Sequence, residues 1–180
     1  MDDQNHILDE EEMEKRSYVE EYNIVSTNKF ILLSIASFGM YEFWWIYKAW
    51  RFFKKEDNLD IMPAMRAFFS ILFLYSLFQT IKEFAQKEGH TESYSSGALF
   101  VGFFIFGLLG RLPDPYWLIS FFGFAFLIPP FSALNRALVN SETYFDKEQE
   151  GFSTRQIILL VIGGFLWAIV LIGLMMGEEM

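Results

Sequence analysis

The last hydrophobic stretch of this 180-residue chain constrains its fold more than any other feature. Residues 157–176 run for twenty positions without one charged side chain. As an α-helix such a stretch is about 30 Å long, which matches the hydrocarbon core of a lipid bilayer. Ser153 and Gln156 stand directly before it in the spacing of an N-terminal capping box. The stretch therefore predicts a membrane-spanning helix and places the chain among membrane proteins.

Four further hydrophobic segments precede this helix, separated by short polar stretches. The chain is 53% hydrophobic, above the roughly 45–50% apolar content that is usual in soluble domains. The five segments are residues 30–53, 63–81, 98–110, 116–138 and 157–176. The sequence shows no extended strand pattern and no internal repeat. We therefore expect residues 26–180 to form an all-α, multi-pass helical membrane protein with four to five hydrophobic helical segments.

The fourth segment contains a pair of prolines. The apolar run before Pro129 and Pro130 has thirteen residues, or roughly 20 Å of helix, which is too short for a hydrocarbon core of about 30 Å. We expect the helix to continue past the prolines with a kink and to end near Leu138. Because interrupted helices form binding sites in many transporters, Pro129, Pro130, Asn135 and Arg136 are a candidate helix-break site. An ordinary kink with Arg136 extended to the headgroups is the alternative.

Residues 1–25 form an acidic tail. Residues 1–21 hold nine acids and two bases, a net charge of −7, although the whole chain carries only −9. This composition predicts a solvated, disordered segment that repels nucleic acid and anionic lipid headgroups. It also lacks the basic and apolar regions of a signal peptide. We therefore expect no nucleic-acid partner.

Residues 41–53 (YEFWWIYKAWRFF) combine aromatic rings with basic side chains. On a helix, residues 41, 44, 48, 51 and 55 fall along one stripe, and residues 43, 46, 50 and 53 along another. Tryptophan and tyrosine favour the membrane–water boundary, and Lys and Arg near helix ends extend to the headgroups. The pattern predicts an anchor to the lipid bilayer, with the candidate residues Tyr41, Trp44, Trp45, Tyr47, Lys48, Trp50, Arg51, Lys54 and Lys55.

Glu42 is the one acid within this stretch. If a straight helix enters the membrane at Ile31, Glu42 lies near mid-membrane, where acids are costly and often functional. If the segment dips and returns, or if the rings mark the interface, Glu42 lies at headgroup level. The neighbouring rings favour the shallow position, and Glu42 stays a candidate intramembrane polar residue.

The distribution of basic residues favours a cytoplasmic N-terminal tail. If the first segment is re-entrant or interfacial, nine of the 14 basic residues fall inside, which satisfies the positive-inside rule better than five full spans do. The nine are Lys15, Arg16, Lys29, Lys48, Arg51, Lys54, Lys55, Arg66 and Arg111.

The sequence offers no reactive centre. Cysteine is absent, and the two histidines, His6 and His90, lie in polar segments without a spaced partner. Zinc-binding, nucleotide-binding and hydrolase motifs are missing. We expect no enzyme, no metal and no cofactor.

Small residues repeat on the last helix at intervals of four. Gly164 with Ala168, and Gly173 with Gly177, are candidate helix-packing pairs because small residues let helices approach closely. Packing within the chain and chance are the simpler readings, and a homodimer seam is the sharper one.

Residues 29–78 resemble a family of small bacterial integral membrane proteins known as a domain of unknown function. The resemblance lies in the pattern F-G-x-Y-E-x-W-W-x-Y-K-x-W over Phe38–Trp50, in the second segment over Arg66–Phe78, and in the entry to the last segment over Phe152–Gly164. It implies bacterial origin, the inner membrane and a four- to five-helix architecture. It assigns no catalytic residue.

Two function classes follow from these observations. The first is a non-catalytic membrane interaction or assembly protein that binds other membrane components, with residues 41–55 and the small-residue faces as its interface. The alternative is a small oligomeric transporter, channel or lipid-handling protein, with Glu42 and the Pro129–Pro130 break lining a path. The depth of Glu42 in the membrane separates the two.

Overall fold

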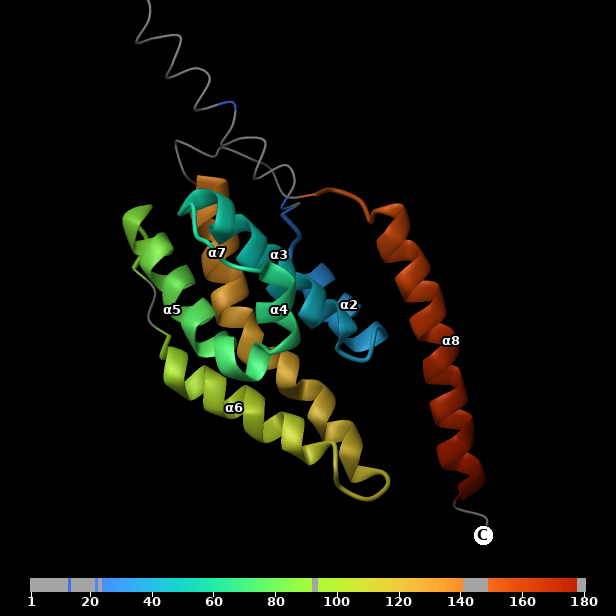
Figure 1. Cartoon of the computed structure of the whole chain (residues 1–180). Coiled ribbons are helices and arrows are strands. Elements are labelled where there is room, and N and C mark those ends of the chain that lie inside the picture. The colour runs from blue at the N-terminus through green and yellow to red at the C-terminus, as the bar shows by residue number, and fades with distance from the viewer. Residues whose placement is uncertain (1–12, 14–21, 23, 92–93, 141–148, 178–180) are drawn as a thin grey trace, which may run out of the picture.

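The structure is a computed structural model that describes residues 13, 22, 24–91, 94–140 and 149–177. Within those residues it contains seven α-helices, one 3-10 helix and no strand, which confirms the all-α prediction (Figure 1). The elements are α2 (Thr27–Ala36), α3 (Met40–Glu56), α4 (Pro63–Phe68), α5 (Ser70–Lys87), α6 (Ser96–Leu109), η1 (Tyr116–Leu127), α7 (Ile128–Asn140) and α8 (Thr154–Gly177).

Two stretches of helix in the described residues are long and apolar enough to cross a membrane. They are Tyr116–Val139, formed by η1 and α7, and Thr154–Met176 in α8. α2 and α6 are apolar but shorter. Length and composition therefore support two candidate spans, and the expected total of four to five is not confirmed. α8 begins at the predicted capping box, in which the Ser153 backbone N–H donates to Gln156 Oε1 over 2.8 Å.

The first hydrophobic segment, residues 30–53, is not one helix. It divides into α2 and α3, which are joined by a turn over residues 37–39. Phe38 and Gly39 have φ angles of 54° and 82°, the left-handed conformation that stops a helix and that glycine adopts without steric cost. The straight-helix reading of this segment is therefore wrong. The turn between α2 and α3 fits a segment that dips and returns, and the position of this segment in a membrane stays a prediction.

The turn between α2 and α3 packs against the middle of α8. The Trp167 indole donates to the Ile35 carbonyl over 2.8 Å and stacks on the Phe38 ring at 4.7 Å. A Cβ added at Gly163 would lie 1.9 Å from the Ala36 carbonyl oxygen. Since Gly163 and Trp167 lie about 14 to 20 Å along a helix of about 36 Å, the turn is near the half-length of α8.

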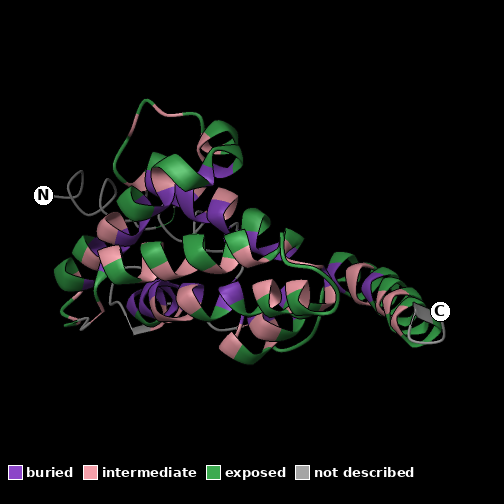
Figure 2. Cartoon of the chain, turned by 90° about the horizontal axis from the view of Figure 1, so that it is seen from below, coloured by how far each residue is buried: buried purple, intermediate pink, exposed green. Residues whose placement is uncertain are grey.

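The core lies among α2, α3, α5 and α7 and is rich in aromatic rings (Figure 2). Phe30 stacks on Phe131 at 4.2 Å and meets the edge of Trp45 at 5.8 Å. Phe53 on α3 meets Phe84 on α5 at 5.7 Å. These contacts join α2 to α7 and hold α3 against α2 and α5, which lie in different parts of the sequence.

The last described residues of the expected tail belong to this core, whereas Met13 is exposed. Tyr22, Ile24 and Val25 are buried, and the Ile24 carbonyl accepts a hydrogen bond from the Gln149 backbone over 2.8 Å. The Lys29 ammonium donates to backbone carbonyls of residues 149–151. The helical body therefore begins at Tyr22, and the remainder of the expected tail lies largely outside the described residues.

The fourth segment continues past its prolines, as predicted. η1 ends at Leu127, and α7 starts at Ile128 and runs through Pro129 and Pro130 to Asn140. A proline lacks an N–H donor, and its ring crowds the carbonyl four residues earlier. The change from 3-10 to α geometry falls where those two effects act on the last turn of η1.

Charged residues lie at two opposite ends of the helical body. The C-terminal ends of α3, α5 and α7 and the first turn of α8 lie at one end of the molecule, and the α6–η1 turn lies at the other (Figure 1). The Lys87 ammonium is 3.9 Å from the Asp57 carboxylate, so the end of α5 lies beside the end of α3. Arg111 lies in the α6–η1 turn. The expected count, which grouped Arg111 with Lys54 and left Lys87 on the other side, does not fit this arrangement.

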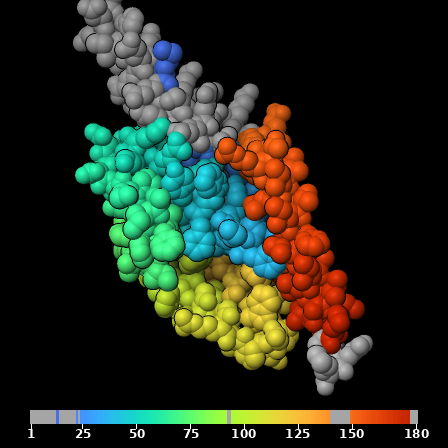
Figure 3. Space-filling view, turned by 45° about the vertical axis from the view of Figure 1, so that its right-hand side comes forward, coloured from blue at the N-terminus to red at the C-terminus, as the bar shows by residue number. Residues whose placement is uncertain are grey.

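α8 lies along the side of α2, and its other faces are open (Figure 3). Only 6% of its apolar span is buried inside the molecule, against 39% for the span formed by η1 and α7. The contact with α2 uses Gly163, whereas Gly164, Ala168 and Gly173 are exposed and Gly177 is the last residue of the helix. The candidate packing pairs therefore do not mediate the contact of α8 with the body.

Candidate functional site

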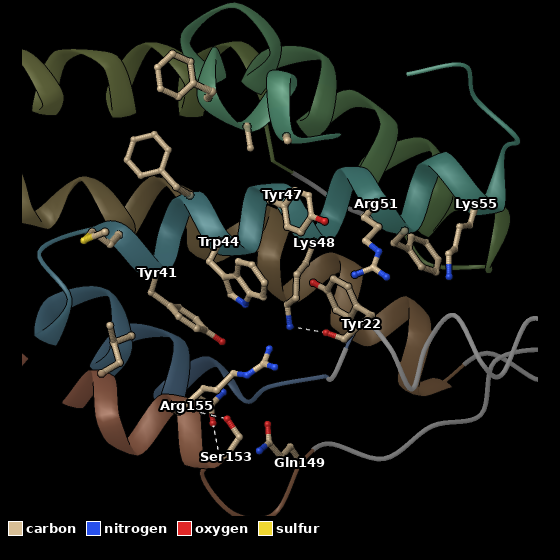
Figure 4. Close-up of a pocket in the computed structure, with 18 residues that line it drawn as sticks. Tyr22, Tyr41, Trp44, Tyr47, Lys48, Arg51, Lys55, Gln149, Ser153 and Arg155 are labelled. Carbon is tan, nitrogen blue, oxygen red and sulfur yellow. Dashed lines mark hydrogen bonds between the residues drawn. The ribbon is translucent and has the colours of Figure 1, made fainter. Parts of the chain in front are cut away.

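One face of α3 lines an open pocket of about 940 Å³, which we call the α3 groove (Figure 4). Its volume is near the top of the range of about 300–1,000 Å³ that ligand sites occupy. The opposite wall consists of the residues before α8 and its first turns, and α4 adds a third wall. From these walls and the chain before α2 come Tyr22, Ala64, Ala67, Phe68, Gln149, Ser153, Arg155, Gln156 and Leu159.

The stripe predicted from helical spacing faces the groove. Its members all line the pocket, together with four further residues of α3. The stripe is Tyr41, Trp44, Lys48, Arg51 and Lys55, and the other four are Met40, Phe43, Tyr47 and Phe52. The second stripe is mostly core, because Ile46, Trp50 and Phe53 are fully buried and only Phe43 is open.

The predicted membrane anchor divides between these two faces. Trp45 and Trp50 are 2% and 1% exposed. The prediction that these two residues anchor the chain at the lipid boundary is therefore wrong. The Trp45 indole donates to the Tyr22 hydroxyl over 2.8 Å, and the Arg66 guanidinium covers the Trp50 ring at 4.4 Å. These contacts come from segments far away in the chain, which helical spacing does not reveal. Trp44 remains on the open face.

One end of the groove is cationic. The Lys48 ammonium donates to the Tyr22 carbonyl and lies 5.0 Å from the centre of the Tyr22 ring. Arg51 and Lys55 follow on the same face of α3, and Arg155 reaches toward Lys48 from the start of α8 (Figure 4). Among the described residues, the lining includes four basic side chains and no Asp or Glu. The described part of this end is therefore rich in positive charge.

Burial changes the acid–base properties of this end. Desolvation lowers the pKa of the Lys48 ammonium from 10.5 to about 8, because burial penalises the charged form of an amine. Desolvation also raises the pKa of the Tyr22 hydroxyl, although its hydrogen bond from Trp45 acts in the opposite direction. Lys48 is therefore mostly charged at pH 7 but loses its charge in mild alkali.

The other end of the groove is apolar and open. Met40 is 71% exposed, Phe43 50%, Trp44 47% and Phe68 77%. Such exposure of neighbouring large apolar side chains marks a contact with membrane or ligand rather than with water. This end follows the turn that packs against the middle of α8, whereas Ser153 and Arg155 at the α8 start border the cationic end. The residues of α8 that line the groove end at Leu159, so the groove borders the first two turns of α8.

Glu42 lies outside the groove. Its side chain is 8% exposed, and its Oε1 would lie 3.6 Å from a Cβ at Gly39, the residue that caps the start of α3. A carboxylate in the first turn of a helix interacts favourably with the helix dipole. Burial raises the pKa of the Glu42 carboxyl to about 8, which disfavours its charged form. Glu42 therefore packs inside the protein at the start of α3, and its depth in a membrane stays a prediction.

Polar side chains at and near the candidate helix-break site make contacts within the protein. Asn135 Nδ2 donates to the Val25 carbonyl over 2.7 Å, while Asn135 Oδ1 is buried without a partner. Ser132 lies 3.3 Å from the Thr27 hydroxyl, and Arg136 is exposed. Neither these residues nor Pro129 and Pro130 line the α3 groove. The polar groups near the prolines tie the chain before α2 to α7.

Several residues of the groove were missed by sequence reasoning. Tyr22 lay in the expected acidic tail, Phe68 in the second hydrophobic segment, and Arg155 in the entry to the last one. A basic residue directly before an apolar helix is a usable signal for the headgroup level. No sequence signal pairs Tyr22 with Lys48, since that contact depends on the tertiary fold.

The described residues contain no group of three His, Cys, Asp or Glu side chains arranged to hold a metal ion. No protein-family model, no curated protein and no solved structure matches this chain. The fold and the site thus define a helical protein with two helices suited to cross a membrane and one amphipathic groove beside the second of them.

Proposed function

We propose that this chain is an integral membrane protein that works without catalysis by binding another membrane component in the α3 groove. The observation that supports this proposal is the distribution of side chains along the groove, which is lined by basic residues at one end and by apolar residues at the other. A water-soluble metabolite would leave the exposed apolar wall without an apolar partner. A component embedded in the bilayer can contact both the apolar wall and the basic end.

The proposed placement in the membrane follows from the helix ends. We place η1–α7 and α8 across the bilayer, α6 as a shorter crossing, and the pairs α2–α3 and α4–α5 as re-entrant segments. The end that carries Lys54, Lys55, Lys87 and Arg155 then faces the cytoplasm by the positive-inside rule, and Arg111 faces the other side. Together with the family resemblance, this points to the inner membrane of a bacterium.

The transport alternative has less support. The two features that best supported transport were Glu42 and the Pro129–Pro130 break. The Glu42 side chain and the polar residue Asn135 near the prolines both make contacts within the protein. Of the alternatives, lipid handling fits the groove best. The homo-oligomer and protein-assembly readings retain the exposed Gly164, Ala168 and Gly173 face of α8 as a candidate surface.

The groove can be tested by filling it. Ala64 lines the apolar end from α4 and is exposed, so Ala64→Trp should occupy the space without disturbing the core. Ala125→Trp, at an exposed position of η1 outside the groove, is the matched control. After mild detergent extraction, native mass spectrometry should show a co-purifying lipid or protein with wild type and Ala125→Trp, and its loss with Ala64→Trp. Equal retention by all three chains would contradict the proposal.

A further inference from the structure

We infer that Glu42 is a proton-binding site that holds the α2–α3 turn closed against α8, so that loss of its proton opens this turn. The site lies outside the α3 groove. The inference goes beyond the proposed function, because it does not depend on what the groove binds.

The Glu42 carboxyl group packs onto the turn itself. The side chain is 8% exposed, and its Oε1, Cδ and Oε2 atoms would lie 3.6, 3.8 and 4.0 Å from a Cβ at Gly39. The carboxyl group therefore covers the side of Gly39 on which any other residue carries a Cβ. A charged carboxylate at such a position has lost most of its water, which costs free energy unless a partner replaces that water.

No partner replaces this water within the described part of the chain. The Glu42 side chain takes part in no hydrogen bond or ion pair there, and burial is the one cause that raises the pKa of its carboxyl group. The start of α3 supplies no donor, because the first three backbone N–H groups of this helix already bond to Ser37 and to the Gly39 carbonyl. Burial without a partner favours the neutral, protonated carboxyl group.

The titratable side chains of the helices around α3 do not compensate a charge at Glu42. The helices packed on α3 are α2, α4, α5 and α7. Their titratable residues are Lys29, Arg66, Tyr75, Lys82, Glu83, Lys87 and Arg136. Lys29 and Lys82 donate to backbone carbonyls, and Arg66 covers the Trp50 ring. The other four side chains are exposed.

The elements packed on the turn and α3 itself add few further groups. α8 and η1 contribute Arg155, which lines the groove, and Tyr116, which begins η1 next to the α6–η1 turn. On α3, the Tyr41 hydroxyl is hydrogen-bonded to the first turn of α8, and the first basic residue is Lys48, six positions after Glu42. None of these groups contributes to the raised pKa of Glu42. Its burial in the closed turn alone therefore sets its preference for the proton.

The turn that the carboxyl group covers is held by packing against α8. Phe38 has a φ angle of 54°, a left-handed conformation that costs free energy for a residue with a side chain. Its ring stacks on Trp167 at 4.7 Å, and the Trp167 indole donates to the Ile35 carbonyl over 2.8 Å. A charge at Glu42 that must reach water therefore acts on a strained turn whose closed form depends on a few contacts.

The direction of the response follows from proton linkage. The closed turn binds the proton of Glu42 more tightly than an open turn does, because an open turn exposes the carboxyl group to water. Each unit of rising pH, between the usual carboxyl pKa and the raised pKa of about 8, therefore favours the open turn by up to about tenfold. Met40 and Phe43 flank Glu42 and line the groove, so the apolar wall of the groove moves when the turn opens.

The bound proton can be observed in the full-length chain in detergent. Infrared spectra separate the carbonyl stretch of a protonated carboxyl group from that of a carboxylate. At pH 7 we expect the band of the protonated group in wild type and in Glu83→Gln, which makes the same change at an exposed position of α5. Glu42→Gln should lack this band. No band in wild type, or an unchanged band in Glu42→Gln, would overturn the inference.

Hydrogen exchange measured by mass spectrometry tests the coupling to the turn. The reference is residues 100–109 of α6, which carry no titratable side chain and correct for the general pH dependence of exchange. Relative to them, residues 33–42 of wild type should lose protection by at least about tenfold between pH 6 and pH 8. Glu83→Gln should behave as wild type, and Glu42→Gln should keep its protection.

The wild-type comparison decides the inference even if Glu42→Gln fails to fold. Equal pH dependence of the two peptides in wild type would show that no proton holds the turn closed and would overturn the inference. Such a failure would leave the proposed groove intact, because Ala64→Trp tests the groove separately.

Discussion

α3 and α8 use apolar side chains in opposite ways. α8 has no charge over twenty residues, yet only 6% of its span is buried inside the protein. α3 carries charged side chains on several turns, yet it contains the fully buried Trp45, Trp50 and Phe53. A helix that is apolar all round but exposed needs lipid around it. The comparison teaches that a charge-free run identified a helix that stays exposed on the protein, whereas the spacing of polar groups identified a helix that packs one face into the core.

The largest effect should come from the buried ring of α3. Trp45→Ala removes a fully packed ring and the hydrogen bond to Tyr22, so we expect a loss of about 3–5 kcal/mol in the free energy of unfolding. The neighbouring Trp44 faces the groove, and Trp44→Ala should cost far less. Thermal unfolding in detergent measures both, and equal destabilisation would contradict the division of α3 into two faces.

A charge on α8 should affect insertion rather than packing. Phe165 is near the middle of α8 and 68% exposed. An arginine at the centre of a membrane helix costs about 2.5–3.5 kcal/mol on insertion scales, so Phe165→Arg should reduce the membrane-inserted fraction, and Phe165→Leu should not. Alkaline extraction of membranes reports this fraction. Full insertion of Phe165→Arg would show that the exposed faces of α8 do not contact lipid.

The contact between α8 and the turn can be weakened at one glycine. Gly163→Ala places a methyl group against the Ala36 carbonyl, which must move, and overpacking of this kind costs about 1–3 kcal/mol. Gly164→Ala meets nothing within 4 Å and should leave stability nearly unchanged. Limited proteolysis of the segment before α8 compares the two variants, with faster cleavage expected for Gly163→Ala only.

The smallest expected effect is a pH dependence of lipid binding at the cationic end. The pKa of Lys48 is lowered to about 8 by burial, so its positive charge is present at pH 7 and is lost as the pH rises through 8. An anionic lipid that occupies the proposed groove should therefore bind more weakly at pH 9 than at pH 7, by less than about tenfold, because Arg51 and Arg155 keep their charge. The Tyr22 hydroxyl stays neutral there because its pKa is raised. Lys48→Arg should remove the dependence, and its persistence in that variant would assign it to another group.

Local patterns predicted part of this structure. The charge-free run and its capping box identified α8, and helical spacing identified the groove-facing stripe of α3. A segment that dips and returns was one of the alternatives, but the position of the break at residues 37–39 was not predicted, because the turn lies within an apolar run and only Gly39 marks it. The burial of Trp45 and the pairing of Tyr22 with Lys48 depend on segments that meet only in the folded chain. Sequence periodicity shows which residues share a face, but not what covers that face.

The most direct test of the central claim is the membrane depth of the two ends of the α3 groove. The chain has no cysteine, so single spin labels can be placed at Phe43→Cys and Lys55→Cys in the full-length protein reconstituted into phosphatidylglycerol–phosphatidylcholine bilayers. Collision rates with oxygen and with a water-soluble nickel complex measure depth. We expect the label at position 43 to collide mainly with oxygen, within the hydrocarbon, and the label at position 55 mainly with nickel, in water. Equal nickel accessibility at both positions would show that the groove does not enter the bilayer and would contradict the account.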